Sequence, residues 1–253
     1  MNNRTQDPIE YQTSLNIESF VMVLLAISVG TLAAVIILPS WMPNLANSLI
    51  GDNPKAFWYL SRGSSFVALS LLWVSMALGL TITNKMARTW PGVAAAFAIH
   101  EYVSLLGLGF AIFHGIILMG DKYISFSLAQ VLIPFTTVGY RPLMVGFGQV
   151  GFYVWLLVAL SFYVRSRIGQ KTWRVIHYIS FLVYCAAVYH GISSGTDTST
   201  SWAQGYYWFS GGSITFLLVY RIIVSVLGKF SKPEIKAAAV SAQVNTREST
   251  PSA

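Results

Sequence analysis

The sequence predicts an all-α integral membrane protein, a bundle of six transmembrane helices with both termini in the cytoplasm. Composition predicts the class, because 55% of the 253 residues are hydrophobic, only 10% are charged, and the mean hydropathy is +0.59. Soluble domains carry about a quarter charged residues, so a chain this poor in charge needs lipid as its solvent. The uneven placement of Lys and Arg predicts the orientation.

Six apolar runs are each close to the roughly 20 residues that a helix needs to cross a bilayer. The N-terminal tail 1–18 is polar and lacks the basic region and cleavage site of a signal peptide, so the first run is expected to remain as an anchor. The tail 229–253 is rich in Ala, Ser, Thr and Gln and is expected to be disordered and cytoplasmic. The predicted spans are 19–41, 57–83, 93–119, 144–163, 173–193 and 206–227.

Lys and Arg are concentrated in every second connection between spans. The N-terminal tail, 83–92, 164–174 and the stretch from Arg221 onward hold one, two, four and five of them, twelve of the sixteen. Cytoplasmic segments are enriched in Lys and Arg, so these four segments are expected inside and the third and fifth spans both run outward. The net charge of +7 is therefore attributed to orientation and anionic lipid, not to nucleic acid.

The four histidines form two pairs, each within one predicted span: His100 with His114, and His177 with His190. At a rise of 1.5 Å per residue, the separations of 14 and 13 residues correspond to about 21 Å and about 19.5 Å. Because the two spans run in parallel, His100 and His177 are expected at one depth near the cytoplasm. His114 and His190 are expected at a second depth near the outer face.

The angular positions of the histidines agree less well than their depths. At about 100° per residue, fourteen steps bring His114 within about 40° of His100, whereas thirteen leave His190 about 140° from His177. A straight fifth helix would not present both imidazoles to one neighbour. We expect a π-bulge, local unwinding or a helix crossing to correct the phase.

A single histidine in a membrane helix is as often an interhelical hydrogen-bonding residue as a ligand. Four histidines at two matched depths favour coordination, because imidazole in hydrocarbon needs a partner and iron accepts its neutral nitrogen. The pairs therefore predict two b-type haems. Zinc is not predicted, since ligands about 20 Å apart cannot converge on one ion, and the single Cys185 excludes a thiolate-held cluster.

The segments HEYVSLLGLGFAIFH and WRVIHYISFLVYCAAVYHG, the second preceded by a basic hinge, resemble the ferric reductase-like transmembrane domain. Ferric reductases, NADPH oxidases and the haem subunit of the bacterial methionine sulfoxide reductase system share this six-helix core. The resemblance covers 57–228 and leaves 19–56 as a first transmembrane helix and outer loop. It implies that His100 and His177 bind the inner haem and that His114 and His190 bind the outer haem.

The resemblance also gives Arg62 a role as a candidate catalytic residue. In oxidases of the family an arginine near the outer end of the second helix lies beside the outer haem, and Arg62 occupies the matching place. The alternative is an interfacial arginine that extends toward lipid headgroups. Those oxidases carry a second histidine one turn beyond the outer ligand, where this sequence has Leu118, which argues against superoxide production.

Both ends of the predicted core carry further candidates. Arg88 and Arg174 belong to the basic ring at the cytoplasmic end and are candidates for bidentate pairing with haem propionates, although the orientation signal alone also accounts for them. On the outer side, the connection 120–143 is expected to form an interfacial helix that caps the outer haem and ends near Pro134.

The sequence thus predicts a dihaem cytochrome of the cell membrane, an oxidoreductase-type subunit that carries electrons across the bilayer. About 25 polar residues follow the last span without a Gly-rich phosphate loop, so no flavin or NAD(P) site is expected. A separate flavoprotein reductase or a membrane quinol is the expected donor, and an outer-side protein the expected acceptor. Two alternatives stay open: a haem-free transporter or channel subunit lined by Arg62, Glu101 and the histidines, and a structural subunit of a larger membrane complex.

Overall fold

A computed structural model describes residues 16–41, 56–121 and 124–248, and no β-strand occurs among them. Six helices are long and apolar enough to cross a membrane, which confirms the predicted number of spans and the multi-pass membrane class. The predicted N-terminal tail up to residue 15, the connection 42–55 and the last five residues lie outside the described part of the chain.

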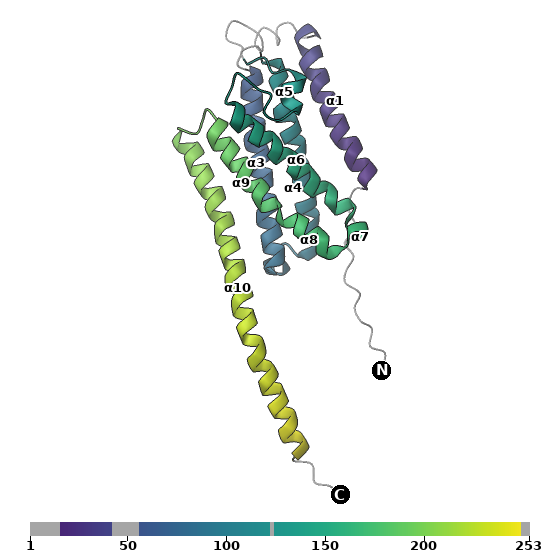
Figure 1. Ribbon diagram of the computed structural model, residues 1–253, viewed down its shortest axis with the longest axis vertical. Helices are drawn as coiled ribbons and strands as arrows, with labels where there is room; N and C mark the ends of the chain where they lie inside the picture. Colours follow the sequence, from purple (N-terminus) through teal and green to yellow (C-terminus); the bar gives the residue numbers. More distant parts are fainter. Residues whose placement is uncertain (1–15, 42–55, 122–123, 249–253) are drawn as a thin grey trace.

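Consecutive spans alternate in direction and pack as one bundle (Figure 1). The spans are α1 (Ile17–Trp41), α3 (Ala56–Thr83), α4 (Val93–Ile117), α6 (Pro142–Tyr163), α8 (Gln170–Tyr178) with α9 (Ser180–Ser194), and α10 (Ser201–Glu248). Short helices connect them: η1 (Met86–Arg88), η2 (Leu118–Gly120), α5 (Leu128–Leu132) and α7 (Arg165–Ile168). We refer to the two ends of the bundle as the α5 end and the α7 end.

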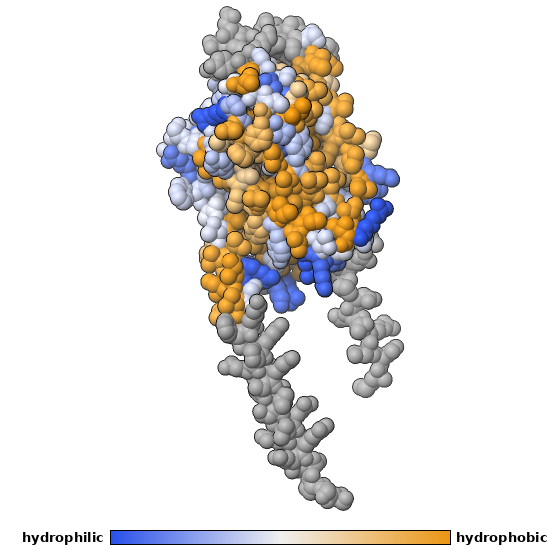
Figure 2. Space-filling view, viewed as in Figure 1, coloured by the Kyte–Doolittle hydropathy of each residue, from blue (hydrophilic) through white to orange (hydrophobic). Residues whose placement is uncertain are grey.

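The outer surface of the bundle is largely apolar, as a lipid-facing surface must be. Figure 2 shows an orange apolar belt over the spans, with hydrophilic residues at the lower edge of the described part and others on the upper left and right flanks. That edge is the α7 end, where the predicted basic ring lies. The distribution suits a chain whose solvent is hydrocarbon around the spans and water at their ends.

The α3–α4 pair is the most extensive helix contact in the bundle. Lipid offers helices no hydrophobic gain on association, so small side chains that let backbones approach closely supply the packing. The small buried residues of this pair are Ser61, Ser64, Ala68 and Ser75 on α3 and Ala96, Gly107 and Gly109 on α4. Two hydrogen bonds join α10 to α3. The Ser70 and Tyr206 hydroxyls are 2.9 Å apart, and Trp73 Nε1 donates to Ser213 Oγ at 2.8 Å.

A dense layer of side chains fills the bundle midway along its length. Gly107 is seven residues from both His100 and His114, and an ideal Cβ on Gly107 would lie 2.9 Å from the ring of Trp155. Trp155 is therefore at mid-depth, where it packs in one core cluster with Leu108 and residues from all six spans.

The fifth span is interrupted at Ile179, between α8 and α9. Ile179 N–H donates to Ile176 O at 3.0 Å, which is the i to i−3 bond of a tightened turn. Such a turn has three residues per turn and rotates each residue about 20° further than an α-helix. The extra rotation brings His190 toward the direction of His177. Of the three corrections that the sequence analysis left open, a π-bulge does not occur in 170–194.

The C-terminal part of α10 also differs from the prediction. The chain is helical from 229 to Glu248, where the sequence analysis expected disorder over 229–253. The stretch KAAAVSAQV is rich in strong helix formers. A helix already formed in the last span extends into it without a new nucleation step.

Replacing Gly107 by Ala is expected to destabilise the bundle by about 1–3 kcal/mol, because the new methyl group would overlap the Trp155 ring and press on Leu71. The measurement is the midpoint of unfolding in a mild detergent. Gly211→Ala is the matched control, because a Cβ there meets nothing within 4 Å and should be neutral or stabilising. Equal shifts in the two variants would contradict the packing described here.

Candidate functional site

The structure brings the four histidines together in two facing pairs between α4 and the α8–α9 span. The ring centroids of His100 and His177 are 6.1 Å apart, with an interplanar angle of 72°. Those of His114 and His190 are 6.3 Å apart at 76°. The first pair lies toward the α7 end and the second toward the α5 end, so the partners and the levels are those that the sequence predicted.

Main-chain carbonyls fix the protonation of three of these imidazoles. A carbonyl only accepts, so Nδ1 must carry the proton and Nε2 keeps a free lone pair. In the neutral form, each ring therefore has Nε2 as its unprotonated nitrogen. The donations are from Nδ1 of His100 to Ser75 O at 2.9 Å, of His114 to Ser61 O at 2.8 Å, and of His190 to Met144 O at 2.8 Å.

A glycine makes the His190 hydrogen bond possible, and small residues occupy the matching positions for the other two. Inside a helix the carbonyl of residue i already accepts from the N–H of residue i+4, so a second donor must approach past the side chain at i+4. An ideal Cβ on Gly148 would lie 2.4 Å from His190 Nδ1, and one on Gly79 would lie 3.5 Å from His100 Cε1. The residues at i+4 from the three acceptors are Ser65, Gly79 and Gly148.

Two serines of α3 add side-chain contacts to the α4 histidines. Ser61 Oγ lies 2.9 Å from His114 Nδ1, and Ser75 Oγ lies 3.2 Å from His100 Nδ1. The serines are fourteen residues apart, as are His100 and His114, and α3 runs antiparallel to α4. The sequence analysis missed both serines, although this matched spacing on neighbouring spans was the signal that identifies them.

His177 is held differently from the other three histidines. No hydrogen bond joins its Nδ1 to a carbonyl of the described residues, and its ring instead stacks on Trp173 with centroids 5.1 Å apart and planes at 29°. Trp173 is one helical turn earlier on α8, so the two side chains share a face.

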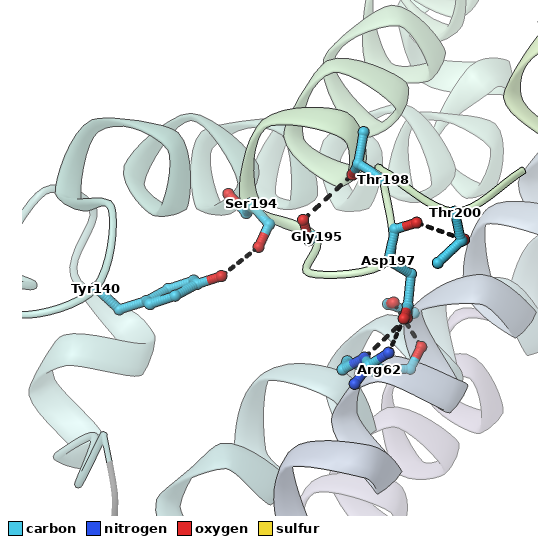
Figure 3. Close-up of polar contacts among 8 residues, drawn as sticks. Arg62, Tyr140, Ser194, Gly195, Asp197, Thr198 and Thr200 are labelled. Carbon is cyan, nitrogen blue, oxygen red and sulfur yellow. Dashed lines mark hydrogen bonds and ion pairs between the residues drawn. The ribbon is translucent and has the colours of Figure 1, made fainter. Parts of the chain in front are cut away.

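Arg62 follows Ser61 on α3 and therefore lies next to the His114 level, as the sequence predicted. Its guanidinium forms a two-pronged ion pair with Asp197, in which Nε donates to Oδ2 at 2.8 Å and Nη2 donates to Oδ1 (Figure 3). Asp197 belongs to the connection between α9 and α10. The pair is partly buried, with 27% of the Arg62 and 18% of the Asp197 side chain exposed.

The α9–α10 connection is tied down at several further points (Figure 3). Tyr140 OH donates to Ser194 O at 2.6 Å, and Thr200 Oγ1 donates to Asp197 O at 2.6 Å. Thr198 Oγ1 donates to Gly195 O at 3.2 Å. The Tyr140 bond anchors the end of α9, which carries His190, to the segment that precedes α6, and the two threonine bonds fix the shape of the connection itself.

The short helix α5 lies beside the His114 level. An ideal Cβ on Gly115 would be 3.6 Å from Val131 of α5. Gln149 and Tyr153 of α6 donate to the last carbonyls of α5, which satisfies groups that would otherwise be unpaired at a helix end. α5 ends at Leu132, two residues before Pro134, as predicted for the helix in the 120–143 connection.

Arg88 and Arg174, the predicted partners of propionates, lie at the α7 end on η1 and α8. Both are exposed.

The described residues contain no group of three or more His, Cys, Asp and Glu able to hold a metal ion. Comparison with protein-family models, curated proteins and solved structures finds no match to this chain.

The Arg62–Asp197 pair is expected to stabilise the protein, because its fork geometry satisfies both groups in a partly buried setting. In a double-mutant cycle of Arg62→Gln and Asp197→Asn, we expect a coupling energy of about 1 kcal/mol, measured by unfolding in detergent. Arg167→Gln, at an exposed position, is the control and should change nothing. Additive single effects would contradict a direct pair.

Proposed function

We propose that this protein is a b-type dihaem membrane cytochrome that carries single electrons across the bilayer. His100 and His177 would bind one haem, and His114 and His190 the other. The observation that carries the proposal is the separation of the facing imidazole rings, 6.1 Å and 6.3 Å, repeated at two levels of the bundle.

This separation suits an iron ion held between two imidazoles. A metal–nitrogen bond is about 2.0 Å long. The centroid of an imidazole ring lies about 1.1 Å from its nitrogens, given ring bonds near about 1.33 Å. One such bond and one such distance on each side of the metal give about 6.2 Å between the two centroids. Two protein ligands per level also suit haem, whose porphyrin supplies the other four nitrogens. A structural zinc ion takes four protein ligands.

The donor chemistry of the rings supports the same ligand. With Nδ1 donating to a carbonyl, His100, His114 and His190 offer Nε2 as a neutral donor. The hydrogen bond fixes the ring orientation and increases the basicity of the ligand. Such rings are costly in a lipid-exposed helix unless both nitrogens find partners, and coordination would supply the second partner.

When bound, each haem would supply a one-electron carrier whose potential depends on its axial ligands, their hydrogen bonds and its burial. The chain itself would position the two haems and exclude water from the space between them. The layer around Leu108 and Trp155 separates the two levels with packed apolar side chains. At the α5 end, α5 and the anchored α9–α10 connection would limit the approach of acceptors.

The distribution of basic residues supports an orientation in which the α7 end and both termini are cytoplasmic and the chain lies in the cell membrane. A flavoprotein reductase or a membrane quinol would deliver electrons near His100 and His177, with Arg88 and Arg174 toward the propionates of the inner haem. An acceptor or partner subunit would take electrons at the His114 level. The ion pair with Asp197 favours a role for Arg62 in holding that end together over direct contact with an acceptor.

Purified protein is expected to carry two haems per chain and to give a b-type reduced-minus-oxidised absorbance spectrum. His114→Ala should remove the outer haem and His100→Ala the inner one, each leaving the other signal in place. Cys185→Ala, at an exposed thiol, should keep both. A folded, colourless wild-type protein would reject the proposal and favour the haem-free transporter or the structural subunit.

Gly148→Ala is expected to weaken the outer haem site roughly 10–100-fold, the usual cost of losing a group that orients a metal ligand. The added methyl group would displace the His190 ring from Met144 O. The measurement is the rate of haem transfer to an apoprotein acceptor, resolved for the two haems. Gly151→Ala, one turn further along α6 and with ordinary contact at 3.4 Å, is the control. Equal rates in both variants would contradict the assigned role of Gly148.

A further inference from the structure

The inner pair is asymmetric in a way that the outer pair is not. His100, like both outer histidines, is fixed by a hydrogen bond from Nδ1 to a helix carbonyl. His177 has no such bond within the described residues, and the indole of Trp173 lies almost parallel to its ring. Stacking thus takes the place of a hydrogen bond at this one position.

Trp173 also contacts a second aromatic ring. Its ring centroid lies 6.0 Å from that of Phe162, and the Arg165 guanidinium lies 4.1 Å above the Phe162 ring. The result is a column that runs from Arg165 through Phe162 and Trp173 to His177. A ring packed between two neighbours has a fixed orientation, so it can fix the orientation of His177 in turn.

The indole N–H of Trp173 is buried and has no hydrogen-bond partner among the described residues. This group is a donor only, and a buried donor without an acceptor is destabilising. An acceptor that does not belong to the chain would remove that cost. The stack places the indole beside the His177 ring, at the end of the bundle that carries the exposed cations Arg88, Arg167 and Arg174, so the fitting acceptor is an anionic oxygen.

We propose that Trp173 is a positioning residue of the inner site with two tasks. Its ring holds His177 in the ligating orientation, and its Nε1–H donates to a carboxylate of the haem bound between His100 and His177. The inference rests on the proposed function, since a haem carries carboxylates at one edge of the macrocycle. It goes beyond that proposal by naming the group that replaces the missing hydrogen bond at His177.

Two substitutions in the full-length holoprotein separate the two tasks. Trp173→Phe keeps an aromatic ring against His177 and removes only the N–H. Trp173→Leu removes both. Trp208→Leu is the control, because Trp208 lies on α10 and is 81% exposed. The outer haem, held by His114 and His190, reports whether each variant is folded.

Two readouts follow the inner haem: its rate of transfer to an apoprotein acceptor, and its spin state in absorbance and electron paramagnetic resonance spectra. Trp173→Phe is expected to lose the inner haem roughly tenfold faster, as expected for a lost hydrogen bond to a charged group, while staying low-spin. Trp173→Leu is expected to add a high-spin fraction to the inner signal. Added imidazole should reverse that fraction, because it can replace a His177 ring that no longer ligates.

The outcomes that overturn the inference differ from those that overturn the proposed function. A wild-type rate of inner-haem loss in Trp173→Phe would reject the hydrogen bond to the carboxylate. A fully low-spin inner haem in Trp173→Leu would reject the positioning of His177. Wild-type protein without haem would instead remove the proposed function itself, whatever the Trp173 variants do.

Discussion

A neutral imidazole has one nitrogen that donates and one that accepts, and inside a lipid bilayer both need partners. The bundle satisfies the donor side of His100, His114 and His190 with carbonyls that already serve their own helices. Because each ring must reach a backbone carbonyl of the neighbouring helix, the two helices approach closely. The residues beside these carbonyls are small. The arrangement leaves each Nε2 as the free nitrogen, so the hydrogen bonds that stabilise the histidines also leave a lone pair on each ring available.

The two levels of histidines are kept apart by rigid packing. Trp155 rests against Gly107 halfway between the levels, in a core cluster to which all six spans contribute. Packing of this density gives the rings little freedom to move toward or away from each other, which is what a bridging ligand of fixed size requires. In membranes, where helices gain nothing from the hydrophobic effect on associating, such contacts also carry much of the stability.

The two ends of the bundle hold their histidines by different means. At the α5 end, Asp197 pairs with Arg62 and the Tyr140 hydroxyl binds Ser194 O, so polar contacts fasten the connection that follows His190. At the α7 end, the aromatic column that includes Trp173 supports His177. At the α5 end, polar contacts hold the α9–α10 connection in place. At the α7 end, a stacked tryptophan ring supports His177 and the nearby cations are exposed.

The sequence by itself determined the six spans and the depth of each histidine, because span length and position along a helix are local properties of hydrophobic runs and residue spacing. Only the tertiary structure decided how the thirteen-residue spacing is accommodated, since the turn at Ile179 tightens where the sequence allowed several corrections. It likewise decided the partners: Ser61 meets His114 across 53 residues and Asp197 meets Arg62 across 135. Contacts between such distant residues depend on which faces of the helices pack together, and hydrophobic patterning leaves those faces unspecified in a helix that is apolar all round.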